Sequence, residues 1–245
     1  VALADAAELA DRPGHVTRPD GTVLFDPAAA PARLRTTAAF VHRLLTATRS
    51  RAPRLGCFGL HEWAMVYRTD DARHRDTVPL RLGRAGTDAV VESARISCTH
   101  YDAYRFFTDA AAPRNELVPT RERQAEMEQP GCLHATMDLY KWAYKLAPAV
   151  PSEVVADCFA LAADVRELDM RASPYDLSAH GFDPVPIETP AGRAEYARAQ
   201  AGFAERAAPL REELIDLAGR LARADDRPGN DDGAAGEVPG GPATA

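Results

Sequence analysis

The sequence predicts a mainly α-helical protein, with at most a small β-sheet, that folds as a single globular domain over residues 31–224. Apolar residues recur at helical spacing in several long segments, whereas strand-like alternation is confined to short ones. The chain has 245 residues, of which 46% are hydrophobic and 27% are charged. This composition is ordinary for globular proteins, and the length is enough for one large core.

Residues 1–30 are rich in Ala, Pro, Gly and Asp and hold no lasting period, so we expect a loosely ordered leader with one short strand at Thr22–Phe25. The chain begins with Val1 rather than Met, and we expect a further N-terminal section before it. At the other end, residues 225–245 are almost entirely Gly, Pro, Ala and acidic residues, which predicts a disordered tail.

Helices are predicted, in chain order, over residues 32–50, 58–68, 102–107, 132–146, 152–171 and 190–224. Ser152 is the predicted N-cap of its helix, and Thr189 followed by Pro190 is a typical start for the last one. The core stripe predicted for the 152–171 helix consists of Val154, Cys158, Leu161, Val165 and Leu168. Short strands are expected at 78–82 and 95–101, and a long crossing loop, of a kind that is often functional, at 110–131.

Several features indicate a cytoplasmic protein. No run of eighteen apolar residues exists, which predicts no membrane span, and Val1–Ala10 lack the pattern of a signal peptide. The four cysteines form no C-x-x-C pair, which excludes common zinc-ribbon and thioredoxin patterns and suggests a reducing compartment. We expect them to be small buried side chains, with Cys132 the first candidate if one is a nucleophile.

The charge is unevenly distributed. The net charge is −7, yet residues 31–84 contain eleven arginines against four acidic residues. Such a basic segment could follow the phosphates of DNA, which is the one macromolecular partner that we predict. A solvated helix face is the alternative interpretation. The sequence does not determine the oligomeric state.

The chemistry is expected around the 132–146 helix. There, spacings of four and seven place His134, Asp138 and Lys141 on one stripe, with an acid, a base and an ammonium suited to proton transfer. Asp169, at the end of the next long helix, is a further candidate catalytic carboxylate. Candidate binding residues around this stripe are His61, Glu62, Trp63, His100, Asp102, Tyr140, Trp142, Tyr144, Arg171, Tyr175 and Asp176.

The mixture of aromatic and polar side chains suits a pocket that stacks a planar ligand and binds its edge. A large aromatic core with satisfied histidines is the alternative. We predict no obligatory cofactor, but a transition metal held by histidines and carboxylates is a competing hypothesis. The Glu-x-x-His signature of di-iron bundles is absent, as are the nucleophile elbow, the phosphate-binding P-loop and the dinucleotide turn.

Three blocks carry a family resemblance: GCFGLHEWAMVYR at 56–68, QPGCLH at 129–134 running on to MDLYKWAYK at 137–145, and RELDMRASPYDL at 166–177. With these blocks, the chain resembles, over roughly residues 34–220, a family from GC-rich bacteria that is commonly labelled 3-methyladenine DNA glycosylase. The resemblance implies a hydrolase of DNA repair that releases an alkylated purine after flipping it from the duplex.

That activity implies roles for several residues. The resemblance makes Asp138 or Asp169 the carboxylate that steadies an oxocarbenium-like sugar, and Trp142, Tyr140 and Tyr144 the rings that stack on the base. Two other functions remain open from the residues themselves. One is a metal-dependent or acid/base enzyme acting on a small aromatic or nucleobase-like molecule, with no role on DNA. The other is a protein that binds such a ligand without converting it.

Overall fold

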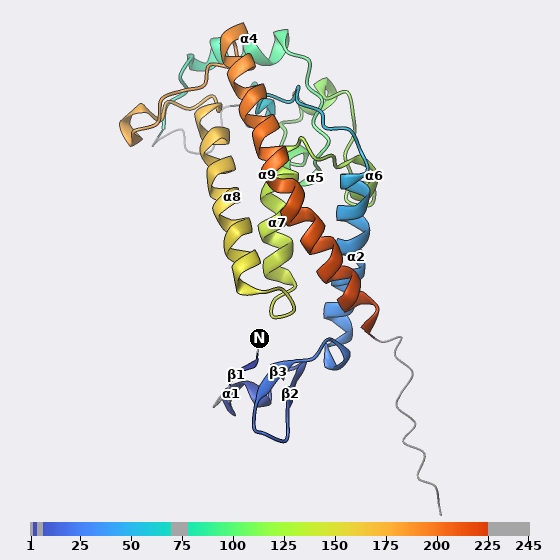
Figure 1. The fold of residues 1–245 in the computed structure, drawn as a ribbon. Coiled ribbons are helices and arrows are strands. Elements are labelled where there is room, and N and C mark those ends of the chain that lie inside the picture. Colours follow the sequence, from blue (N-terminus) through green and yellow to red (C-terminus); the bar gives the residue numbers. More distant parts are fainter. Residues whose placement is uncertain (1, 4–6, 70–77, 225–245) are drawn as a thin grey trace, which may run out of the picture.

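The computed structural model describes residues 2–3, 7–69 and 78–224, and it is mainly helical, as predicted (Figure 1). Four long helices form its body: α2 (Ala32–Arg49), α7 (Leu133–Lys145), α8 (Ser152–Arg171) and α9 (Pro190–Ala222). α2 packs along α9, and α7 contacts both α8 and α9. The expected tail at 225–245 lies outside the described residues. In the described part, no helix combines the length and apolar character needed to cross a bilayer.

The long helices follow the apolar pattern closely. The predicted core stripe of α8 is buried along its full length, from Val154 to Leu168. At the start of α9, the Thr189 hydroxyl accepts a hydrogen bond from the amide of Gly192, and Pro190 takes the first helical position, where its missing N–H costs nothing. The prediction for Ser152 was wrong by one residue: Pro151 occupies the N-cap position, and Ser152 is the first residue of the helix.

A small sheet lies at one end of the long helices (Figure 1). The strand expected near Thr22–Phe25 is present as β3 (Val23–Phe25). β3 is the middle strand, with β1 (Ala2–Leu3) and β2 (His15–Thr17) antiparallel on either side, and His15 is opposite Phe25. The helix α1 (Ala7–Ala10) precedes β2, and the short 3-10 helix η1 (Pro27–Ala29) leads into α2.

Short elements gather at the opposite end (Figure 1). They are α3 (Leu60–Ala64), α4 (Gly83–Ser93), α5 (Tyr101–Tyr104), η2 (Ala112–Arg114), α6 (Gln124–Met127) and η3 (Ser178–His180). The described residues between α2 and α7, 50–69 and 78–132, therefore form an irregular cap over one end of the long helices, and this cap supplies half of the candidate site described below.

The cap is where the sequence patterns were least reliable. The helix predicted over 58–68 shrinks to α3 because Phe58 and Arg68 adopt positive φ angles of 47° and 50°, which an α-helix does not tolerate. The strands predicted at 95–101 and 78–82 do not form: Ile96 and Leu80 each make only an isolated bridge. α4 was not predicted, because the glycines at its start favour a loop.

Candidate functional site

α7 directs the predicted polar stripe into the cap. The ring of His134 lies against the rings of His61 from α3 and His100 from the start of α5, with centroid distances of 4.4 Å and 5.3 Å. One turn further along α7, Asp138 contacts His100 and forms an ion pair with Lys141. Three histidines that are far apart in the sequence thus meet at one place, each of them close to carboxylates.

The first group of ligand-type side chains, which we call trio A, consists of His61, His134 and Asp169. One donor atom from each residue lies within 4.8 Å of the other two. Nε2 of His61 is 3.0 Å from Oδ1 of Asp169. Both atoms are buried, and neither has a hydrogen-bond partner among the described residues. Two polar atoms that approach so closely without hydrogen-bond alignment are arranged as two ligands of one ion are arranged.

The guanidinium of Arg166 binds Oδ2 of Asp169, the carboxylate oxygen that does not face His61. Nη1 of Arg166, one turn earlier on α8, donates to Oδ2 of Asp169 at 2.8 Å and to Oε1 of Glu62 at 3.1 Å. Arg166 therefore fixes the orientation of the Asp169 carboxylate and leaves Oδ1 free to face the two imidazoles. This arrangement, in which an outer residue orients an inner one, is usual around metal ligands.

The second group, trio B, consists of His100, Glu128 and Asp138. Nε2 of His100 lies 3.2 Å from Oε1 of Glu128 and 3.3 Å from Oδ2 of Asp138. The side-chain amide of Gln124 donates to the same Glu128 oxygen at 2.6 Å. His100 and Glu128 are almost completely buried, so two carboxylates converge on one imidazole in the interior.

The surroundings push the three imidazoles to different protonation states. Burial would lower the pKa of His61, but the charge of Asp169 outweighs it and the pKa is raised well above the usual value. Burial is likewise outweighed at His100, where hydrogen bonds with Asp138 and Glu128 raise the pKa to about 9. At His134, burial and then the charge of His61 lower the pKa to about 3. His134 is thus a neutral imidazole between two protonated ones at neutral pH.

The carboxylates respond in the opposite direction. Burial alone would raise the pKa of Asp169, but the charge of His61 lowers it far below the usual value. Asp138 also has a lowered pKa, since its bonds to His100 and the charge of Lys141 outweigh burial. Both groups are therefore ionised and able to bind cations.

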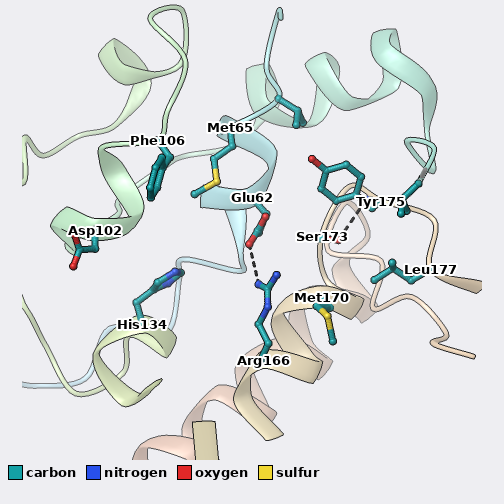
Figure 2. A pocket seen from close by; sticks show the side chains of 12 residues that line it. Glu62, Met65, Asp102, Phe106, His134, Arg166, Met170, Ser173, Tyr175 and Leu177 are labelled. Carbon is teal, nitrogen blue, oxygen red and sulfur yellow. Dashed lines mark hydrogen bonds and ion pairs between the residues drawn. The ribbon is translucent and has the colours of Figure 1, made fainter. Parts of the chain in front are cut away.

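A cavity of about 450 Å³ opens over trio A, with His134 in its wall. Figure 2 shows the Glu62–Arg166 pair between Phe106 and His134 on one side and Tyr175 on the other. The wall residues are Glu62, Met65, Val66, Val78, Asp102, Phe106, His134, Arg166, Met170, Ser173, Tyr175 and Leu177. The wall of the cavity is therefore mixed, with charged and polar groups beside the trio and about as many apolar side chains.

Most of the predicted aromatic stacking residues do not line this cavity. Trp142 is buried and packs edge-on against Phe40 of α2. Tyr144 is 66% exposed, and Tyr140 packs against it and against Phe159 on the outside of α7 and α8. Trp142 lies on one side of α7, and Tyr140 and Tyr144 lie on another. None of the three rings is therefore on the face of α7 that meets the cap.

Some of the remaining predicted binding residues line the cavity, and others stabilise the fold. Tyr175 lines the cavity, as do Glu62 and Asp102. Trp63 is completely buried, and its indole N–H donates to the carbonyl of Ala172 at 2.9 Å, so its role is structural.

Two more of the predicted binding residues hold the chain after α8 in place. Arg171 donates through Nε to the carbonyl of Asp183, and Asp176 accepts hydrogen bonds from the amide and hydroxyl of Ser178. Neither residue lines the cavity over trio A.

Three residues of the site were missed. Glu128 lies in the segment predicted as a long functional loop, but nothing in its local pattern marked it among many charged neighbours. Arg166 is three residues before Asp169 on α8, a spacing that places the two on one helical face and could have revealed it. Phe106 follows α5, and no spacing pattern distinguished it from the other aromatic residues of the chain.

Cys132 does not have the surroundings of a nucleophile. The side chain is buried, and burial raises the pKa of its thiol well above the usual value. A thiol that stays protonated in the interior is inert, so the small buried residue is the better description.

Many arginines of the basic 31–84 segment are occupied within the protein. Arg49 pairs with Glu212 and Arg81 with Glu188, while Arg51 donates to backbone carbonyls, including that of Glu128. Arg73 and Arg75 lie outside the described residues. In the described part of the segment, at least these three arginines therefore have partners within the protein.

No family model, curated protein or solved structure matches this chain.

Proposed function

We propose that this protein is a metal-dependent enzyme that acts on a small molecule bound in the cavity over His134. The observation that carries the proposal is the approach of His61 Nε2 to Asp169 Oδ1, 3.0 Å apart, buried, and without a hydrogen bond. The two atoms form a buried ion pair without an aligned hydrogen bond, so both can bind a further group. A cation between these two atoms and His134 satisfies both.

The chemical nature of trio A limits the choice of ion. Two imidazoles and one carboxylate form the donor set of many catalytic zinc sites and of non-haem iron(II) sites, which keep coordination positions open. Here the open side is the cavity, because His134 reaches its wall. A divalent ion would supply Lewis-acid catalysis, or oxygen chemistry if the ion is iron.

The chain's own residues suit a small ligand with an aromatic or nucleobase-like part. Phe106 and Tyr175 offer ring surfaces, and Met65 and Met170 add adaptable apolar contacts. Glu62 is held by Arg166 at the cavity wall and can accept hydrogen bonds from ligand N–H groups. Arg166 links the cavity to Asp169, so ligand contacts with the Glu62–Arg166 pair would also affect the orientation of trio A.

Metal analysis tests the metal part of the proposal. Protein stripped with a chelator is dialysed against Zn²⁺, Mn²⁺ or anaerobic Fe²⁺, and bound metal is counted. We expect the wild type to retain at least one ion, and His61→Gln and Asp169→Asn each to retain one ion fewer than the wild type. His42→Gln is a matched control, because this half-buried ring hydrogen-bonds to the carbonyl of Ile215 on α9 and belongs to neither trio. Retention of less than about a tenth of an equivalent by the wild type would rule the metal out.

Ligand screening tests the substrate class. Metal-loaded protein is heated with nucleobases and small aromatic metabolites, and stabilising ligands are incubated with it and analysed for turnover by mass spectrometry. We expect a stabilising compound to be converted by the wild type and not by Asp169→Asn. Stabilisation without conversion by any loaded form would instead identify a binding protein.

DNA N-glycosidic hydrolysis, which the family resemblance implies, is the second candidate. Its support in the site is a carboxylate, Glu62, beside the rings of Phe106 and Tyr175, a combination suited to an alkylated purine. The assay is release of 3-methyladenine from methylated DNA. Release by the wild type that is no greater than release by Asp138→Asn would end this candidate.

A further inference from the structure

We propose that trio B is a second metal site, so that His100, Glu128 and Asp138 hold one ion next to the ion of trio A. This inference rests on the proposed function, because it adds a second ion to the same centre. One donor atom from each of the three residues lies within 4.8 Å of the others. One imidazole and two carboxylates form a donor set typical of iron, manganese and zinc in helical proteins.

Burial and orientation distinguish trio B from an ordinary surface cluster. Glu128 is 1% exposed, and no described arginine or lysine forms a direct ion pair with it, although the buried guanidinium of Arg211 interacts with its charge from further away. Its direct partners are the His100 ring and the amide of Gln124, a neutral donor that fixes the orientation of the carboxylate. A buried carboxylate held by an amide is the usual outer support of a metal ligand.

The ammonium of Lys141 occupies Asp138 of trio B when no metal ion is bound there. Its ammonium contacts Asp138 and also lies 3.2 Å from Oδ2 of Asp102. Asp102 therefore gives the ammonium a second partner when an ion takes its place at Asp138. An ion bound by Asp138 would therefore compete with one ammonium contact, which Asp102 can take over.

The two trios are close enough to act together. The ring of His134, a donor of trio A, is 5.3 Å from the ring of His100, a donor of trio B. His134 lines the cavity together with Asp102, which holds Lys141 on the side of trio B. Two ions on either side of this ring would place concentrated positive charge at one end of the cavity, an arrangement suited to a substrate that develops negative charge.

Metal stoichiometry tests the proposal. Full-length protein is stripped and titrated with Mn²⁺, and bound ion is counted by elemental analysis and by electron paramagnetic resonance. We expect two equivalents in the wild type, one in Glu128→Gln and Asp138→Asn, and one in His61→Gln. Glu126→Gln is the matched control, because this exposed residue lies in α6, two positions before Glu128, and pairs with Arg123. This variant should bind two equivalents. Dipolar broadening in the doubly loaded wild type should vanish in the single-site variants.

The same titration separates a failure of the second site from a failure of the proposed function. One equivalent in the wild type that is lost in His61→Gln and kept in Glu128→Gln overturns the second site and leaves trio A standing. No bound ion in the wild type overturns both proposals.

A further variant, Lys141→Met, tests the second site through a gain of metal binding. Loss of metal in the other variants could instead result from misfolding. Removing the competing ammonium should tighten binding of the second ion severalfold, a gain that misfolding does not produce. Weaker or unchanged binding of that ion in a folded Lys141→Met protein would contradict the proposal.

Discussion

Replacement of Asp169 by Asn should be the most destabilising conservative change at the site. The Asp169 side chain is 0% exposed and faces His61, which is 1% exposed, so the substitution removes the counter-charge of a buried imidazolium. Breaking a buried charge pair costs about 3–5 kcal/mol. His61 can release its proton instead of remaining charged, which favours the lower end, about 3 kcal/mol. Arg166 is half exposed, so loss of its pairing adds little.

Thermal unfolding, followed by circular dichroism in the presence of a chelator, measures this loss. For a domain of this size we expect the Tm of Asp169→Asn to fall by roughly 6–12 °C. Asp164→Asn is the matched control on the same helix, because Asp164 pairs with Arg206 where both side chains are about half exposed. That control should cost less than about 1 kcal/mol. Equal stabilities of the two variants would refute the burial of an Asp169–His61 pair.

Three further predictions concern the site and its surroundings. In chelated protein, His100 with its pKa of about 9 contributes stability that is complete below its unfolded pKa of about 6.5 and is lost as the pH rises through 9. Unfolding between pH 6 and 10 should show this decline, and the decline should be smaller in His100→Gln, where His61 with its raised pKa still contributes. Phe106→Ala should weaken binding of any aromatic ligand in thermal-shift titrations and barely change the metal content. Equal losses of ligand binding and metal content would contradict a role of this ring in ligand binding alone. Tyr144→Ser should change neither the metal content nor ligand binding, since the ring is 66% exposed on the outer face of α7; a loss of ligand binding would restore its predicted stacking role.

The position of the site on α7 illustrates what helical periodicity can reveal. His134, Asp138 and Lys141 follow from spacing alone, because residues four and seven apart lie on one face of any helix. The same rule could not tell which face of α7 meets the cap. Trp142 belongs to the same segment, yet it packs against Phe40 of α2, and only the arrangement of the helices decides this.

The sequence by itself determined the helical class, the long helices with their buried stripes, and the polar character of α7, because those properties depend on local periodicity. The two trios were decided by tertiary structure alone. His61 meets Asp169 through a cap of short elements whose course depends on positive φ angles at Phe58 and Arg68. Glu128 reaches His100 from a loop without any periodic pattern. Contacts between distant segments depend on how the whole chain packs, and no local spacing encodes them.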